Sequence, residues 1–180
     1  MSKRIVPTIT GAFSKAPGFF PPCRLWLYGN IRLLLQNLAY VPLALVGPGH
    51  TPQELEKVGE DAREIVFNGQ ILVCGIHNYA HQRSAIVPLR YGSPRIVVFS
   101  GGFRSHLGDD LMNEPFKAAQ QWRRYWDPMT DLAVSLRAPS SLPTYGHRNP
   151  TVDRLVAELA EGKLDGLCGV YNPYPPILRE

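Results

Sequence analysis

Short apolar runs alternate with amphipathic segments through the middle of the chain. Apolar runs that end at glycine or another turn residue are typical of strands buried on both faces of a sheet. Such runs cover residues 43–46, 71–74, 95–99 and 131–136. Between and after them, apolar residues spaced by three and four predict helices near residues 52–67, 78–90 and 150–161.

Capping residues support the first and the last of these helices. Thr51 can cap the helix that opens at Pro52, and Glu54 completes a capping box. Asn149 followed by Pro150 forms a similar start for the last helix. Strands that alternate with helices favour right-handed crossovers and a parallel sheet. We therefore predict an α/β fold, a Rossmann-like three-layer domain with a mostly parallel sheet.

The N-terminal region and one long connection depart from this alternation. Residues 1–20 contain several Pro and Gly and are expected to form a flexible arm, which leaves 21–180 as a single domain. Residues 31–38 suggest a short helix. The connection 103–130 is longer than usual, so we expect it to carry a helix of its own and a specific role.

The composition is that of a globular protein without a membrane span. The chain of 180 residues is 44% hydrophobic and 19% charged. The apolar stretch 31–46 is too short for a span and contains Arg32 and Pro42. No signal peptide is evident, and the three cysteines show neither metal-ligand spacing nor a disulfide framework. We expect a cytoplasmic protein with no membrane partner.

Glycines follow three of the predicted strands. They are Gly47, Gly49, Gly75, Gly101 and Gly102. The carboxyl ends of parallel strands meet at one edge, where glycine lets the backbone approach a phosphate. The net charge of +4 permits such an anionic partner. We predict a phosphate-binding site at this edge. The third glycine of a dinucleotide fingerprint is missing, so no cofactor is expected.

Two histidines follow the second predicted strand. His77 and His81 are four residues apart and share one face if a helix has already begun. Such a pair can bind a metal, but no Glu or third ligand lies nearby in the sequence, so no metal is expected. Hydrogen bonds to the glycine-rich loops or to a bound phosphate are the preferred interpretation. We expect both histidines and Arg104 to lie near the cleft that the glycines form.

Basic residues are dense in the middle of the chain, and aromatic residues are interleaved with the later ones. Arginine neutralises phosphates and aromatic rings stack on bases, which together suit single-stranded nucleic acid. The basic set is Arg83, Arg90, Arg95, Arg104, His106, Arg123 and Arg124. The aromatic set is Phe103, Trp122, Tyr125 and Trp126. Packing of these rings in a core or an interface stays open as the alternative.

Four segments, in this order, resemble the DNA-processing protein family DprA, also called Smf. They are LWLYGNIRLL at 25–34, LALVG at 43–47, GIHNYAH at 75–81 and GSPRIVVFSGG at 92–102. The family shows an L-Y-x-x-G-N entry, a strand that ends in V-G-S/T-R, a G-I-D-x-x-A-H segment and a G-x-T-I-x-V-L-x-x-G strand. The resemblance covers about residues 21–102, which correspond to the first half of the family's Rossmann-like core.

The resemblance implies a function in DNA uptake and natural transformation. The implied partners are single-stranded DNA and the recombinase RecA, to which the DNA is passed, and a homodimer stays open. Gly49 or His50 stands where the family has an arginine after its first strand, and His77 stands where it has an aspartate. Arg148 lies where the family has an N-R-x-I segment. The resemblance therefore adds His50 and Arg148 to the phosphate- or DNA-binding positions.

Two other function classes remain as alternatives. A related branch, the LOG type, binds and hydrolyses nucleoside monophosphates through a P-G-G-x-G-T-x-x-E sequence, but the segment 100–104 lacks its Thr and Glu. The chain also lacks a G-x-S-x-G nucleophile elbow and a paired-carboxylate signature. An enzyme is therefore not favoured, and no catalytic residue is assigned. The second alternative is a degenerate paralogue that acts only as a protein-interaction module.

Overall fold

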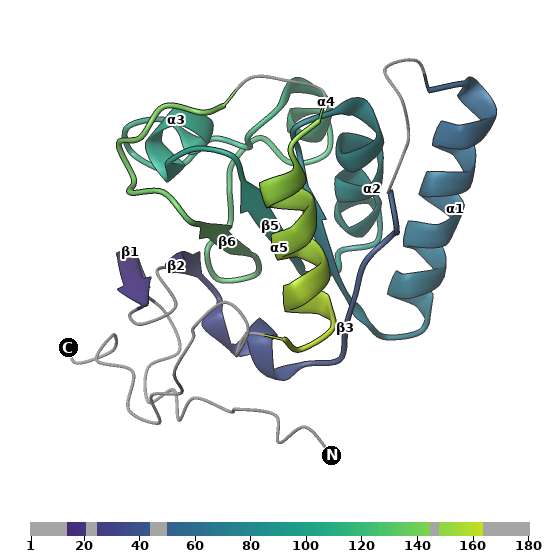
Figure 1. Ribbon diagram of the computed structural model, residues 1–180, viewed down its shortest axis with the longest axis horizontal. Helices are drawn as coiled ribbons and strands as arrows, with labels where there is room; N and C mark the ends of the chain where they lie inside the picture. Colours follow the sequence, from purple (N-terminus) through teal and green to yellow (C-terminus); the bar gives the residue numbers. More distant parts are fainter. Residues whose placement is uncertain (1–13, 21–24, 44–49, 145–147, 164–180) are drawn as a thin grey trace.

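A six-stranded sheet forms the centre of the computed structural model, which describes residues 14–20, 25–43, 50–144 and 148–163 (Figure 1). In spatial order the strands are β1 (Ser14–Phe20), β2 (Leu25–Gly29), β6 (Leu132–Ser135), β5 (Arg95–Phe99), β4 (Ile71–Gly75) and β3 (Leu38–Ala39). Strands β3 to β6 run parallel, whereas β2 is antiparallel to β6 and β1 is antiparallel to β2. The predicted α/β class and the mostly parallel sheet are therefore confirmed.

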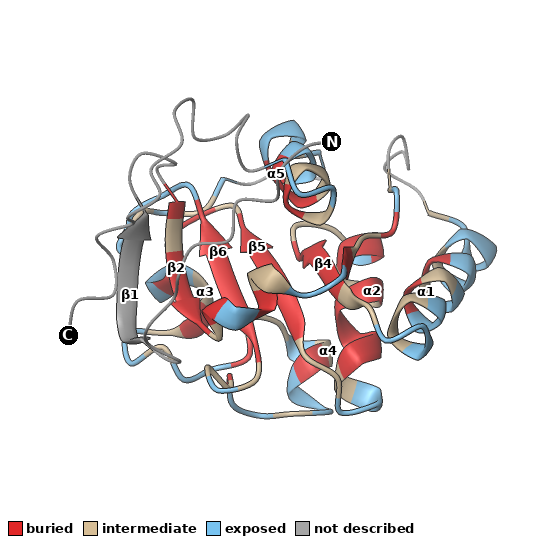
Figure 2. Cartoon of the chain, turned by 90° about the horizontal axis from the view of Figure 1, so that it is seen from below, coloured by how far each residue is buried: buried red, intermediate tan, exposed pale blue. Residues whose placement is uncertain are grey.

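Helices cover both faces of this sheet (Figure 2). Helices α1 (Pro52–Phe67) and α2 (Tyr79–Arg90) belong to one face, and α1 packs mainly against α2. Helix α5 (Pro150–Ala160) covers the other face, across β4 and β5. All three helices lie where the apolar spacing predicts them.

The predicted helix starts are present as hydrogen bonds. The Thr51 side chain accepts from the Glu54 N–H at 3.2 Å, and the Glu54 carboxylate accepts from the Thr51 N–H at 2.8 Å. At α5, the Asn149 side chain accepts from the Val152 N–H at 3.2 Å. Each cap satisfies backbone donors that have no partner within the helix, and so defines where the helix begins.

Side chains of the parallel strands alternate between two apolar cores. In β4, Leu72 and Cys74 pack on the side of α1 and α2, whereas Val73 packs on the side of α5. Strand β5 repeats this alternation, as a strand covered on both faces must. Burial raises the pKa of the Cys74 thiol to about 12, so this cysteine is an apolar core residue rather than a nucleophile.

The edge of the parallel part differs from the prediction. Its outer strand is β3, in which Leu38 pairs with Ile71, and not the run 43–46. Leu43 lies outside any strand, and residues 44–46 fall outside the described ranges. Strand β3 follows a 3₁₀ helix, η1 (Ile31–Leu35). Because β3 has only two residues, its sequence cannot show the alternation of apolar and polar positions that identifies a strand. Residues 14–20, which the sequence assigns to the arm, form β1.

A buried ion cluster ties the connection between β5 and β6 to the sheet. This connection carries α3 (Phe103–Leu107) and α4 (Lys117–Gln120), as its length suggests. The cluster consists of Arg95, Glu114, Arg123 and Asp131. Arg95 lies 2.6 Å from Glu114 and 3.0 Å from Asp131, and Arg123 contacts both carboxylates.

The ion cluster corrects part of the predicted basic set. The side chains of Arg95, Glu114 and Asp131 are fully buried, and Arg123 is only partly exposed. A guanidinium held between buried carboxylates cannot also neutralise a phosphate on a DNA strand. Arg95 and Arg123 are therefore structural residues.

Within the described ranges, no helix is long and apolar enough to span a membrane.

Candidate functional site

A cavity opens where β5 and β6 end and α5 begins. Its volume is about 230 Å³, and its polar lining comes from Ser100, Arg137, Thr144, Arg148, Asn149 and Thr151. Phe99 and Val152 are among its apolar lining residues. The cavity, called here the α5 cavity, lies beyond the carboxyl ends of parallel strands, which is where open α/β sheets bind ligands.

The lining of the α5 cavity favours an anion. Arg137 and Arg148 are exposed and bring positive charge to its rim. The first residues of α5 form another part of the lining, and a helix N-terminus carries partial positive charge. Hydroxyls of Ser100, Thr144 and Thr151 supply further donors. This combination of groups suits the oxygens of a phosphate.

The backbone N–H groups of the two glycines after β5 donate hydrogen bonds to other residues of the protein. The Gly101 N–H donates to His106 Nε2 at 3.2 Å, and the Gly102 N–H donates to the Ser141 carbonyl at 2.9 Å. A Cβ built on Gly101 would lie 2.5 Å from the backbone of Pro143, and one on Gly102 would overlap a backbone carbonyl oxygen. The close approach that these glycines permit is therefore to residues 138–143. This corrects the prediction that Gly101 and Gly102 let the backbone approach a phosphate.

Replacement of Gly102 with alanine tests this assignment. The added methyl group would collide with the carbonyl oxygens of Ala138 and Pro139, so we expect the free energy of unfolding to fall by about 1–3 kcal/mol. Urea denaturation measures this loss. Gly69→Ala is the wrong control because Gly69 has a positive φ, whereas Gly59→Ala makes the same change on α1, where the atom nearest to the added methyl group is Nε of the flexible Arg83 side chain, at 3.3 Å. A Gly102→Ala protein of unchanged stability would contradict the packing role.

His81 connects the end of β4 to the first turn of α5. Its Nδ1 accepts from the Gly75 N–H at 3.0 Å, which requires a lone pair on Nδ1 and leaves the proton on Nε2. Nε2 then donates to Asp153 Oδ1 at 2.9 Å. Burial lowers the pKa of His81 more than the neighbouring carboxylate raises it. His81 is therefore neutral, and its tautomer is defined by its two partners.

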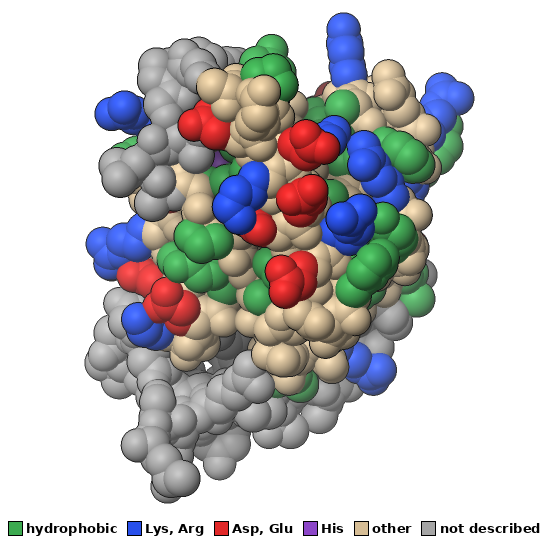
Figure 3. Space-filling model, turned by 90° about the vertical axis from the view of Figure 1, so that its right-hand side faces the viewer, with side chains coloured by type: hydrophobic (Ala, Val, Ile, Leu, Met, Phe, Trp, Pro, Cys, Tyr) green, Lys and Arg blue, Asp and Glu red, His purple; other side chains and the backbone are tan. Residues whose placement is uncertain are grey.

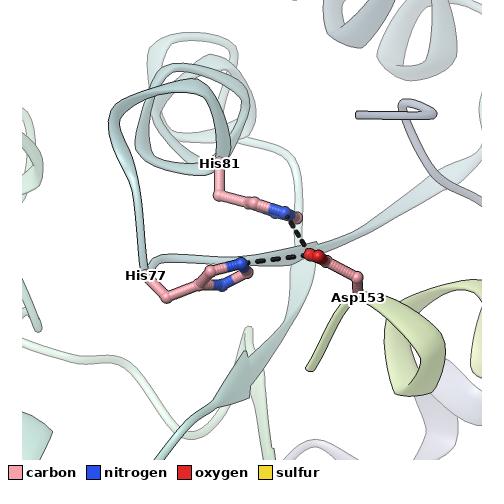
Figure 4. Close-up of side chains that lie close together, drawn as sticks. All are labelled: His77, His81 and Asp153. Carbon is pink, nitrogen blue, oxygen red and sulfur yellow. Dashed lines mark hydrogen bonds and ion pairs between the residues drawn. The ribbon is translucent and has the colours of Figure 1, made fainter. Parts of the chain in front are cut away.

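His77 lies against the same carboxylate (Figure 4). Its Nε2 is 3.0 Å from Asp153 Oδ1, and its ring centroid is 4.2 Å from that of His81. The His77 side chain is 3% exposed, yet neither ring nitrogen has a hydrogen bond of good geometry. A Cβ on Gly75 would lie 2.8 Å from His77 Nδ1, so this glycine makes room for the ring.

Asp153 is the partner that both histidines share. We call His77, His81 and Asp153 the histidine–aspartate cluster. Burial raises the pKa of Asp153, but the contacts of its carboxylate with the two histidines outweigh this effect and hold the pKa well below its usual range. Half of the Asp153 side chain remains exposed. The cluster therefore carries a permanent carboxylate at the first turn of α5.

A metal ion fits this cluster in distance but not in tautomer. The ligand atoms of the three residues lie within 4.8 Å of one another, which is close enough for a shared ion. A metal-bound His81 Nε2 would need its proton on Nδ1, where the Gly75 N–H already donates. The amide of Gly75 therefore disfavours His81 as a ligand, and the cluster is better described as two imidazoles that contact one carboxylate.

The other predicted site residues are dispersed. Gly47 and Gly49 lie outside the described ranges. His50 acts electrostatically on His81, and its buried Nδ1 has no hydrogen-bond partner. Arg104 is exposed on α3. Of the predicted residues that the structure describes, only Arg148 lines the α5 cavity.

Arg83 lies in a different place, a groove between α1 and α2. The groove is also lined by Arg63 and Arg90 and by Glu56 and Glu60. Figure 3 shows the α1 side of the molecule, where acidic side chains lie among the Lys and Arg side chains. This surface has mixed charge, so it does not form the continuous positive track that a phosphate backbone would follow.

The predicted aromatic set divides into core and surface residues. Phe103 and Trp126 are buried, which excludes them as platforms for bases. Trp122 and Tyr125 are half exposed. The guanidinium of Arg90 lies 4.9 Å from the centroid of the Trp122 ring, so one face of this indole already has a cationic neighbour.

Two site residues escaped the sequence reasoning. Asp153 follows the predicted helix start at Asn149 and reads as an ordinary first-turn acid. Arg137 follows the fourth apolar run, and a lone arginine after a strand carries no motif. Arg137 follows a predicted strand, and Asp153 lies in the first turn of a predicted helix. This placement at the carboxyl end of the sheet is the signal that could have identified them as site residues.

Comparisons with known proteins complete the description. A scan against protein-family models finds no matching family, and searches of curated proteins and of solved structures find no match either.

Proposed function

We propose that this chain is a DprA-like protein with a Rossmann-like domain that binds single-stranded DNA through its phosphates. The observation that carries the proposal is the α5 cavity, where Arg137 and Arg148 meet the N-terminus of α5. The ordered likeness of residues 25–102 to the DprA motifs supports the nature of the ligand. Transfer of the DNA to RecA belongs to the same proposal.

The proposed contact is to the backbone rather than to bases. Arginines, hydroxyls and a helix end bind phosphate oxygens, which are the same in every sequence. Affinity should therefore depend little on base sequence and fall steeply as salt rises. Stacking on a ring such as Trp122 would add a smaller share, because the two buried aromatic residues cannot contribute.

The double variant Arg137→Ala/Arg148→Ala tests the cavity. Removal of two charge-assisted hydrogen-bond donors should weaken binding by about a hundredfold or more, since each such hydrogen bond contributes about 1.5–3 kcal/mol. The slope of log affinity against log salt should become shallower by about 0.7 for each phosphate that is no longer neutralised. Fluorescence anisotropy with labelled oligo-dT across a salt series measures both quantities.

Arg63→Ala is the matched control, because Arg63 is exposed on α1 and lines the mixed-charge groove instead. It should change affinity much less than the double variant. Equal effects in the two proteins would contradict a specific cavity, and no binding at micromolar protein would exclude DNA. Adenosine monophosphate is tested beside the oligonucleotide. Release of free base would identify the LOG-type alternative, and no activity with either ligand would favour an interaction module.

A further inference from the structure

The histidine–aspartate cluster and the α5 cavity share one structural element. Asp153 belongs to the first turn of α5, and the preceding residues Arg148 to Val152 line the cavity. A carboxylate in a first helical turn interacts with the same positive helix end that would attract a bound phosphate. Asp153 therefore competes with an anion in the cavity, and it does so as long as its charge is not compensated.

The cluster has room for one additional proton. When both imidazoles are neutral, the three side chains carry one negative charge, from Asp153. His77 has two buried ring nitrogens without hydrogen bonds, and Nε2 lies 3.0 Å from Asp153 Oδ1. Protonation of His77 would place an imidazolium against this carboxylate and bring the net charge of the cluster to zero.

A second proton is disfavoured by the geometry. Protonation of His81 would require a proton on Nδ1, where the Gly75 N–H donates. It would also place two imidazolium rings with centroids 4.2 Å apart. The cluster therefore changes between two charge states that differ by one proton.

Among the described residues, further titratable groups act on the cluster or line a pocket with it. His50, from the segment before α1, interacts electrostatically with His81. Tyr40, from the segment after β3, lines a small pocket together with His81 and Asp153. Arg137 and Arg148 line the α5 cavity together with the first residues of α5.

We propose that anion binding in the α5 cavity is coupled to the uptake of one proton by the histidine–aspartate cluster. The coupling rests on the proposed function, because it regulates the same cavity. A protonated His77 neutralises Asp153, which removes a repulsive charge beside the bound phosphate. By linkage, a bound phosphate favours the protonated cluster to the same degree. The protein then holds DNA more tightly in mild acid than in mild base.

Two variants with opposite expected effects test the coupling. For the wild-type protein, affinity for labelled oligo-dT at constant ionic strength should be about tenfold higher near about pH 5.5 than near about pH 8.5, which corresponds to a coupling of about one pKa unit. Asp153→Asn should bind tightly at both values, because the repulsive charge is gone and no carboxylate remains to stabilise an imidazolium at the buried His77. The oxygen that accepts from His81 is kept in this variant. His77→Gln should bind weakly at both values, because no imidazolium forms.

A merely structural role would not produce this pattern, since it would weaken both variants alike. Calorimetry in two buffers of different ionisation heat measures directly the proton taken up on binding, up to one per site. If His77→Gln does not fold, Asp153→Asn alone decides. Binding with an equal pH slope in wild type and Asp153→Asn would overturn the coupling and leave the proposed function standing. No binding of oligo-dT at either pH would overturn the proposed function, and the coupling with it.

Discussion

Replacement of Asp131 with asparagine is expected to lower the free energy of unfolding by about 3–5 kcal/mol, because it removes one carboxylate from a buried ion cluster. Asp131 accepts from the Arg95 backbone N–H and from its Nε, at 3.1 and 3.0 Å, and also contacts Arg123. Without this charge, two guanidinium groups share the single carboxylate of Glu114. A buried Arg95 that is not compensated accounts for most of the decrease.

Urea unfolding at neutral pH measures this effect, and Asp61→Asn is the matched control. It makes the same chemical change on α1, where Asp61 lies 3.1 Å from Lys57 in an exposed pair. Exposed pairs of this kind contribute no more than about 0.5 kcal/mol. The expected difference between the two variants is therefore several kcal/mol. A decrease of less than about 1 kcal/mol for Asp131→Asn would show that water reaches the cluster and replaces the carboxylate.

The ion cluster also shows why the basic residues were misjudged from the sequence. Arg95 and Arg123 stand in a basic stretch with aromatic neighbours, and composition alone cannot distinguish a paired guanidinium from a free one. In the sequence, Glu114 lies 19 residues and Asp131 lies 36 residues after Arg95. Such pairing depends on tertiary contacts that no local pattern contains. The connection 103–130 carries helices, as predicted, and the contacts of its Glu114 and Arg123 are structural.

Most of the fold could be predicted because its signals are local. The capping box at Thr51 defines one helix start from nearby residues alone. A proline directly after each capping residue, Pro52 and Pro150, marks both helix starts in the same local way. Strands β4, β5 and β6 are continuous apolar runs because helices cover both faces of the sheet. Strand β3 carries no such signal, since its pairing with β4 involves two residues.

Tertiary contacts give several of the predicted site residues other roles than those expected from the sequence. A glycine is required at position 75 because a Cβ there would collide with the His77 ring. Its N–H donates to His81 and is not free for a phosphate. The two histidines were expected near a phosphate, and their partner is Asp153, which follows His81 by 72 residues in the chain. Sequence spacing identifies pairs on one helix, whereas this third member comes from a helix on the opposite face.

Acid is expected to destabilise the protein through His106. Its ring stacks on Phe99 with centroids 4.6 Å apart, and its Nε2 accepts from the Gly101 N–H at 3.2 Å. Burial lowers the pKa of His106 to about 4, compared with about 6.5 in an unfolded chain. The unfolded state therefore binds the proton first as the pH falls. The contribution of His106 to stability is complete above about pH 6.5 and decreases down to about pH 4, by about 3 kcal/mol at most.

The variant His106→Gln isolates this contribution, because an amide oxygen can still accept from Gly101 but does not titrate in this range. Urea unfolding at about pH 7.5 and about pH 4.5 gives the acid-dependent decrease in stability for each protein. We expect this decrease to be about 2–3 kcal/mol smaller in His106→Gln than in the wild type. The pKa of His81 is also lowered by burial, so part of the acid dependence should remain in the variant. An equal decrease in both proteins would mean that His106 is already protonated, or reached by water, in the folded state.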